Sequence, residues 1–393
     1  MLRFYTAGES HGKVLIGFLE GLPAGLEIDR ELIDRQLFRR QLGYGRGGRM
    51  MIENDQVEIL SGVRHGRTLG SPVSFMIANK DWQNWRISMS CDPVQDDADQ
   101  RVVTRPRPGH ADLPGALKYQ TRDIRDILER ASARETAART AGGAFARIFL
   151  EYFGVRIASH VLAVGRERVA SGYESLPFDD IAAAENKSDE AYLRCADTET
   201  AARMRALIDE AAKSGDTLGG IVEIAAVGVP PGLGSHVQWD RRIDGRIAGA
   251  MMSIPSVKAV EVGDGVAGAQ KPGSLVHDAI SYDVAARSFR HETNRAGGIE
   301  GGVSNGEEVY VRVYLKPIPT LRRPLTSVDI HSKQVFDAAV ERGDVCAVPA
   351  AGVVAEAMLA LELGGAFLEK FGGDSMNETA ENYTRFMERV KKY

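Results

Sequence analysis

Two histidines stand in segments whose composition could prepare them for proton transfer. His11 lies in Gly8–Gly12, where the glycines allow a tight turn and the close approach of a ligand. His110 lies in Arg105–Asp112, where prolines restrain the backbone and hold Arg107 and His110 in place before a ligand binds. A lone histidine is more often a hydrogen-bonded core or surface residue, and a proline-rich segment is equally typical of a rigid surface turn. Each segment taken alone leaves these alternatives open.

Arginines form a second group. Some end a predicted helix or follow it in a glycine-rich loop, and two stand four residues apart in a second predicted helix, which predicts that they share one helix face. Arginine forks bind phosphate and carboxylate bidentately, so several of them together predict a small polyanionic ligand. Solvated helix faces would explain any single pair, but not arginines among glycines. These residues are Arg39, Arg40, Arg46, Arg49, Arg130 and Arg134. A further segment, Arg342–Asp344, places an acid beside a base and is by itself typical of a surface turn.

Other motifs and the composition exclude several classes of protein. Gly43–Gly48 satisfies the pattern G-x-G-x-x-G, but it follows a predicted helix, whereas a dinucleotide-binding fingerprint follows a strand. The eight histidines show no spacing that supports a metal site. The net charge of −5 argues against a nucleic-acid-binding protein. Three scattered cysteines and an N-terminus without a signal-peptide pattern predict a cytoplasmic protein.

The elements that must position these residues are strands and helices in mixed order. Their order lacks a regular βαβ alternation, and no linker divides the 393 residues, so we expect one α+β domain. Predicted strands cover residues 3–6, 14–19, 57–60, 71–77, 219–229 and 307–317. Predicted helices cover residues 29–42, 123–153, 180–213 and 347–368, followed by a polar tail of low order at about 372–393.

The last predicted helix is long enough to cross a membrane. It contains Glu356 and Glu362, and a carboxylate near the centre of a bilayer costs about 2.5–3.5 kcal/mol. We therefore expect a helix buried in a soluble protein, with both glutamates at its water-facing edge.

Three long motifs resemble the signatures of the chorismate synthase family. They are GESHGKVLIGFLEGLP (8–23), RASARETAARTAGGAF (130–145) and GDVCAVPAAGVVAEAM (343–358). Between them, GYGRGGRM, RPGHAD, MSIPSVKAVEVGDG, AGGIEGGVSNGE and LKPIPT are similar to further family segments and follow the family's order. The resemblance extends from Arg3 to about Phe371. One departure is Gly343, which stands where the family usually has serine or histidine.

The resemblance implies a fold and an activity. The fold would be a single-domain β-α-β sandwich, with helices between two antiparallel sheets, assembled as a homotetramer. The activity would be the 1,4-anti elimination of phosphate from 5-enolpyruvylshikimate 3-phosphate, giving chorismate at the last common step of the shikimate pathway. It would require reduced FMN without net redox change. The FMN would be reduced by the enzyme itself with NADPH or by an external flavin reductase.

The resemblance also implies roles for particular residues. His11 would protonate the departing phosphate, His110 would exchange a proton with reduced flavin near N1, and Asp344 would assist removal of the C6 proton near flavin N5. The residues implied to bind substrate are Arg40, Arg46, Arg49, Arg107, Arg134 and Arg342, of which Arg40 and Arg46 would also bind NADPH. The residues implied to bind FMN are Arg130, Ala131, Ser132, Pro255, Ser256, Gly301, Lys316, Pro317, Ile318, Pro319, Thr320 and Arg342.

Two other functions fit a similar site. A regulatory protein could hold a phosphorylated ligand without turnover, but His11, His110 and Asp344 are all present. An oxidoreductase could use the flavin for net hydride transfer, which would consume NADPH in proportion to product.

Overall fold

Two antiparallel sheets enclose a layer of helices. The computed structural model describes residues 2–47, 54–95, 101–171, 176–184, 193–285, 287–341 and 343–393. The four-stranded sheet has the order β1 (Arg3–Ala7), β2 (Val14–Glu20), β6 (Val73–Ala78) and β3 (Glu58–Ser61). The five-stranded sheet has the order β10 (Val257–Val262), β15 (Val309–Leu315), β9 (Gly220–Val227), β7 (Arg156–Val164) and β8 (Glu167–Arg168).

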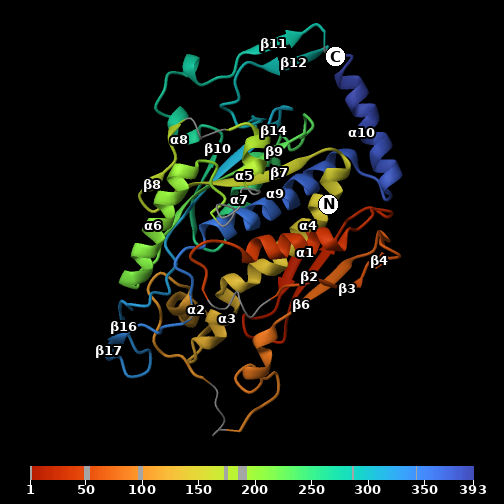
Figure 1. Cartoon of the computed structure of the whole chain (residues 1–393). Coiled ribbons are helices and arrows are strands. Elements are labelled where there is room, and N and C mark those ends of the chain that lie inside the picture. Colours follow the sequence, from red (N-terminus) through yellow and green to blue (C-terminus); the bar gives the residue numbers. More distant parts are fainter. Residues whose placement is uncertain are drawn as a thin grey trace.

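Helices fill the space between the sheets (Figure 1). Helix α4 packs on β2, and α9 packs on β7 and β9. The two helices also pack on each other, and a Cβ on Gly143 would lie 2.4 Å from the Cβ of Ala357, so this approach requires glycine. The expected sandwich with helices between antiparallel sheets is confirmed. The helices of this layer are α1 (Arg30–Gln41), α4 (Thr136–Tyr152), α7 (Ile243–Met252) and α9 (Val348–Phe371).

Helix α1 begins and ends as its residues predict. The Asp29 side chain accepts a hydrogen bond from the backbone N–H of Leu32 at 3.0 Å, which caps the first turn. Ile33 and Leu37 are fully buried on one face. This face fixes α1 against α4 and brings Arg40, in the last turn, into the interior.

The predicted helix over 123–153 is broken in two. Helix α3 (Arg125–Ala131) ends at Ser132, whose backbone is extended (ψ 141°), and a 3-10 turn, η3 (Ala133–Glu135), leads into α4. The Ser132 hydroxyl caps this turn by accepting from the backbone N–H of Arg134 at 3.3 Å. The prediction that Arg130 and Arg134 share one helix face is therefore wrong. Serine competes with the helix through such local bonds, and the apolar periodicity alone does not reveal the break.

Helix α9 is a core helix, as expected. Among the described residues it is the one helix long and apolar enough to cross a membrane, and 89% of its most apolar window is buried by the protein itself. The placement of Glu356 at a water-facing edge is wrong, because Glu356 is only 2% exposed. Its carboxylate accepts from Arg39, Arg147 and Arg194. Glu362 is partly exposed and pairs with Arg246 at 3.1 Å.

The predicted polar tail is a helix, α10 (Met376–Val390). The Ser375 side chain caps it by accepting from the backbone N–H of Glu378 at 3.3 Å. Tyr383 and Phe386 place aromatic rings against Phe371 of α9. The residues between about 372 and 393 therefore extend the fold along one side of the sandwich (Figure 1).

The remaining elements surround these layers. The predicted helical region 180–213 contains two helices in its described part, α5 (Phe178–Ala184) and α6 (Thr198–Ser214). Residues 185–192, which lie between them, are outside the described part. Helix α5 packs on the outer side of β7 and β9. The remaining helices are α2 (Asp112–Tyr119), α5 (Phe178–Ala184), α6 (Thr198–Ser214) and α8 (Gly265–Gly268). The hairpins are β4 (Val63–Arg64) with β5 (Arg67–Thr68), β11 (Ile280–Asp283) with β12 (Ser288–His291), β13 (Ile299–Glu300) with β14 (Val303–Ser304), and β16 (Thr326–Val328) with β17 (Val335–Asp337).

Candidate active site

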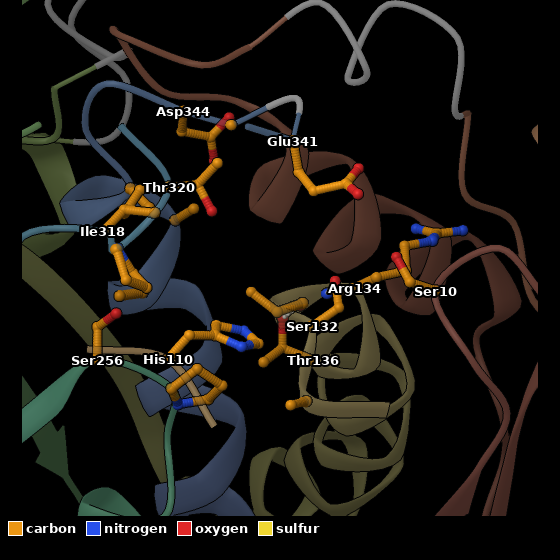
Figure 2. Close-up of a pocket in the computed structure, with 18 of the residues that line it drawn as sticks. Ser10, His110, Ser132, Arg134, Thr136, Ser256, Ile318, Thr320, Glu341 and Asp344 are labelled. Atoms are coloured by element: carbon orange, nitrogen blue, oxygen red, sulfur yellow. Dashed lines mark hydrogen bonds between the residues drawn. The ribbon is translucent and has the colours of Figure 1, made fainter. Parts of the chain in front are cut away.

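One cavity of about 480 Å³ collects most of the residues with chemical potential. Its walls come from the loops after β1 and α1, the break between α3 and α4, the ends of α7 and β15, and the start of α9. Figure 2 shows Ser256, Ile318 and Thr320 on one side and Ser10 and Arg134 on the other. A cavity of this size with a few convergent polar groups is typical of a small-molecule site.

His11 is held on the cavity wall by a buried carboxylate. Its Nδ1 lies 2.9 Å from Oε1 of Glu129, and its backbone N–H donates to Oε2 of the same residue at 2.8 Å. The imidazole stacks on Trp85 with ring centroids 3.9 Å apart. Burial acts to raise the pKa of Glu129, but its hydrogen bonds with His11 and the charges of His11 and Arg125 outweigh burial and lower that pKa. Glu129 is therefore an ionised acceptor.

His110, like His11, is held by a buried carboxylate, and Arg107 binds the same carboxylate. Its Nδ1 lies 2.5 Å from Oδ1 of Asp112, which is fully buried. Arg107 binds the same carboxylate through Nε at 2.9 Å and also donates to the Thr320 hydroxyl at 3.0 Å. Burial acts to raise the pKa of Asp112, but its bonds with His110 and Arg107 hold that pKa well below its usual value. The prolines of this segment therefore restrain a connected charged network.

Two cavity arginines share one carboxylate. Arg134 donates to Asp55 at 2.6 Å and to the Asn79 side chain at 2.9 Å, while Arg40 lies 3.6 Å from Asp55. Arg40 also donates to the hydroxyl of Thr136 at 2.9 Å. Burial lowers the pKa of Arg40 to about 9, with Asp55 opposing this effect and Arg134 and Arg46 adding to it. Arg40 stays charged at neutral pH. Among the described residues, Arg40, Arg46 and Arg134 therefore face the two carboxylates Asp55 and Asp344, a net positive charge that an anion would reduce.

Arg46 and Asp344 form an ion pair across the cavity mouth. Arg46 Nη1 lies 2.7 Å from Oδ2 of Asp344, and the backbone N–H of Gly47 donates to Oδ1 at 2.7 Å. A Cβ on Gly47 would lie 2.8 Å from the carbonyl oxygen of Gly343, so glycine permits this approach. The loop after α1 and the loop before α9 are thereby joined.

The opposite wall is mostly apolar. It includes side chains of Ile254, Leu315 and Ile318, with Lys316 reaching the carbonyl oxygen of Gly109. Ser256 has a positive φ of 72°, which is uncommon for a residue with a Cβ, and its carbonyl accepts from the backbone N–H of Lys316 at 2.9 Å. This wall therefore combines apolar side chains with the polar groups of Ser256 and Lys316.

Comparison with known proteins identifies the family. The family model described as chorismate synthase matches residues 2–368. The chain is 54% identical over 393 residues to the chorismate synthase of Solibacter usitatus (strain Ellin6076), with 100% of both chains covered. It is 56% identical over 391 residues to that of Desulforudis audaxviator (strain MP104C), with 100% of this chain and 98% of the other covered. A crystal structure of a chorismate synthase matches with a TM-score of 0.80 at 42% identity, covering 100% of this chain and 99% of that one.

The chain belongs to the chorismate synthase family. It is therefore an enzyme of the lyase class that serves aromatic amino-acid biosynthesis. The family resemblance inferred from the motifs is confirmed across the whole chain, and so is the expected α+β sandwich.

The structure brings most of the predicted site residues to the one cavity. The predicted residues that line it are His11, Arg40, Arg46, Arg107, His110, Ala131, Ser132, Arg134, Pro255, Ser256, Lys316, Ile318, Pro319, Thr320 and Asp344. Arg49 and Arg342 lie outside the described residues.

Three residues implied to bind FMN do not line the cavity. The guanidinium of Arg130 instead donates to the carbonyl oxygens of Gly8 and Thr6, both at 3.1 Å. Gly301 lies in the turn between β13 and β14. The next residue, Gly302, accepts from the backbone N–H of Ile243, the first residue of α7, whereas Ser256 follows the other end of that helix. Pro317 also falls outside the lining residues. The side chain of Arg130 therefore organises the Gly8–Gly12 loop within this chain.

Several residues of the site were not singled out in the sequence. Glu129, Asp55, Asn79 and Trp85 contact the predicted histidines or arginines but are distant from them in sequence. Asp112 lies two residues after His110 in the motif RPGHAD, so its proximity could have been noticed. No comparable signal links the other four to their partners.

Proposed function

We propose that this enzyme catalyses the 1,4-anti elimination of phosphate from 5-enolpyruvylshikimate 3-phosphate in the presence of reduced FMN. The observation that carries the proposal is a single cavity containing two carboxylate-held histidines and a cluster of arginines. The C3–O bond breaks with its electron pair going to phosphate, and the C6–H bond breaks with its electron pair forming the new π system. The substrate loses a proton and phosphate, and no net oxidation or reduction occurs.

The arginines would bind the substrate's anions. Arg40 and Arg134 hold a positive charge that Asp55 alone does not neutralise, and Arg46 lies beside them at the cavity mouth. Guanidinium groups suit phosphate and carboxylate because they donate two parallel hydrogen bonds. Arg107 is largely engaged by Asp112 and Thr320, so it would contribute charge and orientation more than a free fork. By family resemblance, Arg49 and Arg342 would complete the set.

The apolar wall fits a flavin ring. Ile254, Leu315 and Ile318 offer surface for the ring, while Ser256 and Lys316 offer polar contacts at its edge. Ala131, Ser132, Pro255, Pro319 and Thr320 line the same cavity and would contribute to the FMN site. When bound, reduced FMN would transiently supply an electron that weakens the substrate's C–O bond. The protein's part is to hold the two ligands together and exclude water from them.

Three side chains would handle protons. His11 would give a proton to the departing phosphate, and His110 would exchange a proton at the flavin edge. Asp344 would accept the C6 proton. Its two oxygens already accept from Arg46 and Gly47, but a carboxylate has lone pairs for further hydrogen bonds.

The remaining expectations follow from the family. The enzyme would act in the cytoplasm as a homotetramer. Its FMN would be reduced by an external flavin reductase or by NADPH bound near Arg40 and Arg46. Adding NADPH to anaerobic enzyme with oxidised FMN, without any reductase, distinguishes these two sources of electrons.

Dependence on reduced flavin tests the proposal. Phosphate release from 5-enolpyruvylshikimate 3-phosphate would be measured anaerobically with photoreduced FMN and with oxidised FMN. We expect turnover only with photoreduced FMN. Full-rate turnover with oxidised FMN would contradict the proposal.

A further inference from the structure

We infer that Glu129 is a positioning residue that fixes the tautomer and orientation of His11, an inference that rests on the proposed function. Glu129 is 1% exposed and lies in the last turn of α3. Its carboxylate contacts both Nδ1 and the backbone N–H of His11, and its carbonyl oxygen accepts from the backbone N–H of Ser10 at 2.9 Å. One residue therefore holds the main chain and the side chain of the catalytic loop.

The charge on Glu129 determines which nitrogen of His11 carries the proton. An ionised carboxylate can only accept hydrogen bonds, so a neutral His11 must place its proton on Nδ1. This leaves Nε2 as the ring nitrogen available to a ligand in the cavity. When Nε2 is protonated, the buried carboxylate also stabilises the imidazolium. Of the two protons on the imidazolium, the one on Nδ1 therefore stays with Glu129, and the one on Nε2 is the proton that His11 gives to phosphate.

The surroundings restrict the His11 ring to this geometry. Trp85 stacks on the ring at an interplanar angle of 21°. Arg125 donates to Glu129 at 2.9 Å, and its guanidinium lies 5.0 Å from the centre of the Trp85 ring, so it connects both groups that hold the histidine. Arg101 lies over Trp85 at 4.2 Å. In the described part of the chain, the charged side chains in contact with the imidazole or with its stacking partner Trp85 are Glu129, Arg125 and Arg101. Glu341 pairs with Arg125 at 3.5 Å and lines the same cavity.

Proton transfer from His11 to the departing phosphate conserves protons and charge. As the C3–O bond breaks, the proton on Nε2 of His11 moves to the phosphate oxygen, and the Nδ1–H bond to Glu129 remains in place. His11 is then neutral with its proton on Nδ1, and Nε2 regains a proton from solvent before the next turnover. A glutamine at position 129 could also donate, so it would no longer enforce this tautomer.

Glu135 provides a matched control. It is also a buried glutamate, 7% exposed, in the adjacent turn η3. It accepts from the Thr6 hydroxyl at 2.8 Å and pairs with Arg139 at 3.0 Å, but it does not line the cavity. Glu135→Gln therefore measures the cost of neutralising a buried glutamate near the same loop without touching His11.

The test compares the pH dependence of kcat for wild type, Glu129→Gln, Glu129→Asp and Glu135→Gln with photoreduced FMN. We expect Glu129→Gln to lower kcat about 10–100-fold at neutral pH, as for other carboxylates that orient histidines, with KM within a few-fold. This loss of kcat should become smaller as pH falls through about 6, because the substrate's phosphate, with a second pKa of about 6, then takes up its proton from solvent and needs none from His11. Glu129→Asp, which keeps the charge, should recover part of the loss.

Several results would overturn this inference. One is a Glu129→Gln enzyme with wild-type kcat, and another is a loss of kcat in that enzyme that is equal at every pH. A third is a Glu135→Gln enzyme with the same loss of kcat and the same pH profile. If Glu129→Gln does not fold, Glu129→Asp decides the matter, since a pH-independent loss in that variant contradicts the inference. A wild-type enzyme that forms no chorismate would remove the proposed function, and the inference with it.

Discussion

Two arginine clusters in the described part of the chain differ in what completes them. In the core, Glu356 accepts from Arg39, Arg147 and Arg194, and the remaining guanidinium donors find protein acceptors such as the Ile157 carbonyl oxygen at 2.8 Å. At the cavity, Arg40 and Arg134 share Asp55 and belong to the cavity lining. The first cluster is thus completed by protein groups, whereas the second, on the proposed function, would bind an anion of the substrate. Both clusters contain several arginines, so the number of arginines does not distinguish a structural role from a ligand-binding role. The cavity beside the second cluster makes this distinction.

The core cluster should give the largest effect on stability. Glu356→Ala leaves the buried Arg194 and the half-buried Arg39 and Arg147 without their shared carboxylate. Breaking a buried ion pair in this way costs about 3–5 kcal/mol. Urea unfolding of wild type and variant would measure the loss. A destabilisation below about 1 kcal/mol would show that this cluster is not structural.

The pH dependence of stability sharpens the same point. Burial acts to raise the pKa of Glu356, but Arg39, Arg194 and Arg147 together lower it from 4.5 to about 2. A depressed folded-state pKa stabilises the protein above the unfolded-state pKa, and this contribution disappears as pH falls from about 4.5 to about 2. The difference in unfolding free energy between wild type and Glu356→Ala should therefore shrink over that range. A difference independent of pH would contradict the assignment.

Cavity residues should instead change turnover. His11→Ala and His110→Ala should each lower kcat by about 10²–10⁴-fold, the usual contribution of general acid–base groups, with the circular dichroism spectrum unchanged. Chorismate formation with photoreduced FMN would measure the effect. Unaltered kcat in a folded variant would remove that histidine from the mechanism.

The cavity cluster should lose binding while keeping its stability. Arg134→Met leaves Arg40 and Asp55 as a one-to-one pair and removes a neighbouring cation that lowers the pKa of Arg40. The variant should be about as stable as wild type without ligand, and KM for substrate should rise about 10–100-fold, since a hydrogen bond to a charged group contributes about 1.5–3 kcal/mol. Arg130→Met is the control, because Arg130 contacts Thr6 and Gly8 and not the cavity. Equal increases of KM in both variants would contradict this partition.

The smallest effect is expected at the residue that departs from the family pattern. Gly343 does not have a positive φ, and a Cβ there would lie 3.3 Å from the Cβ of Thr320, a contact that small shifts relieve. Gly343→Ser should therefore keep kcat within a few-fold.

Asp344→Asn should lower kcat by at least about 10²-fold with little change in FMN affinity, because asparagine cannot accept the C6 proton. An inactive Gly343→Ser enzyme together with a fully active Asp344→Asn enzyme would contradict the proton-accepting role of Asp344.

Local chemistry predicted much of this structure, and the remainder depends on tertiary contacts. Asp29 and the apolar stripe of Ile33 and Leu37 predict α1, because a cap and a periodicity are local properties. The burial of Glu356 depends on arginines that are distant in sequence, so no local pattern reveals it. The break at Ser132 is accompanied by a local hydrogen bond, which the apolar periodicity of the segment does not reveal. The site behaves in the same way: motifs identify the histidines and arginines, whereas Glu129 becomes visible only when α3 lies beside the loop that carries His11.

The balance of electrons during turnover tests the central claim most directly. Enzyme with photoreduced FMN and no other reductant would be given excess 5-enolpyruvylshikimate 3-phosphate under anaerobic conditions, while phosphate, chorismate and the flavin spectrum are recorded together. The proposed elimination predicts equal amounts of phosphate and chorismate over many turnovers, with the flavin as reduced at the end as at the start. Oxidation of one flavin for each chorismate formed would contradict it and identify the reaction as a net redox process.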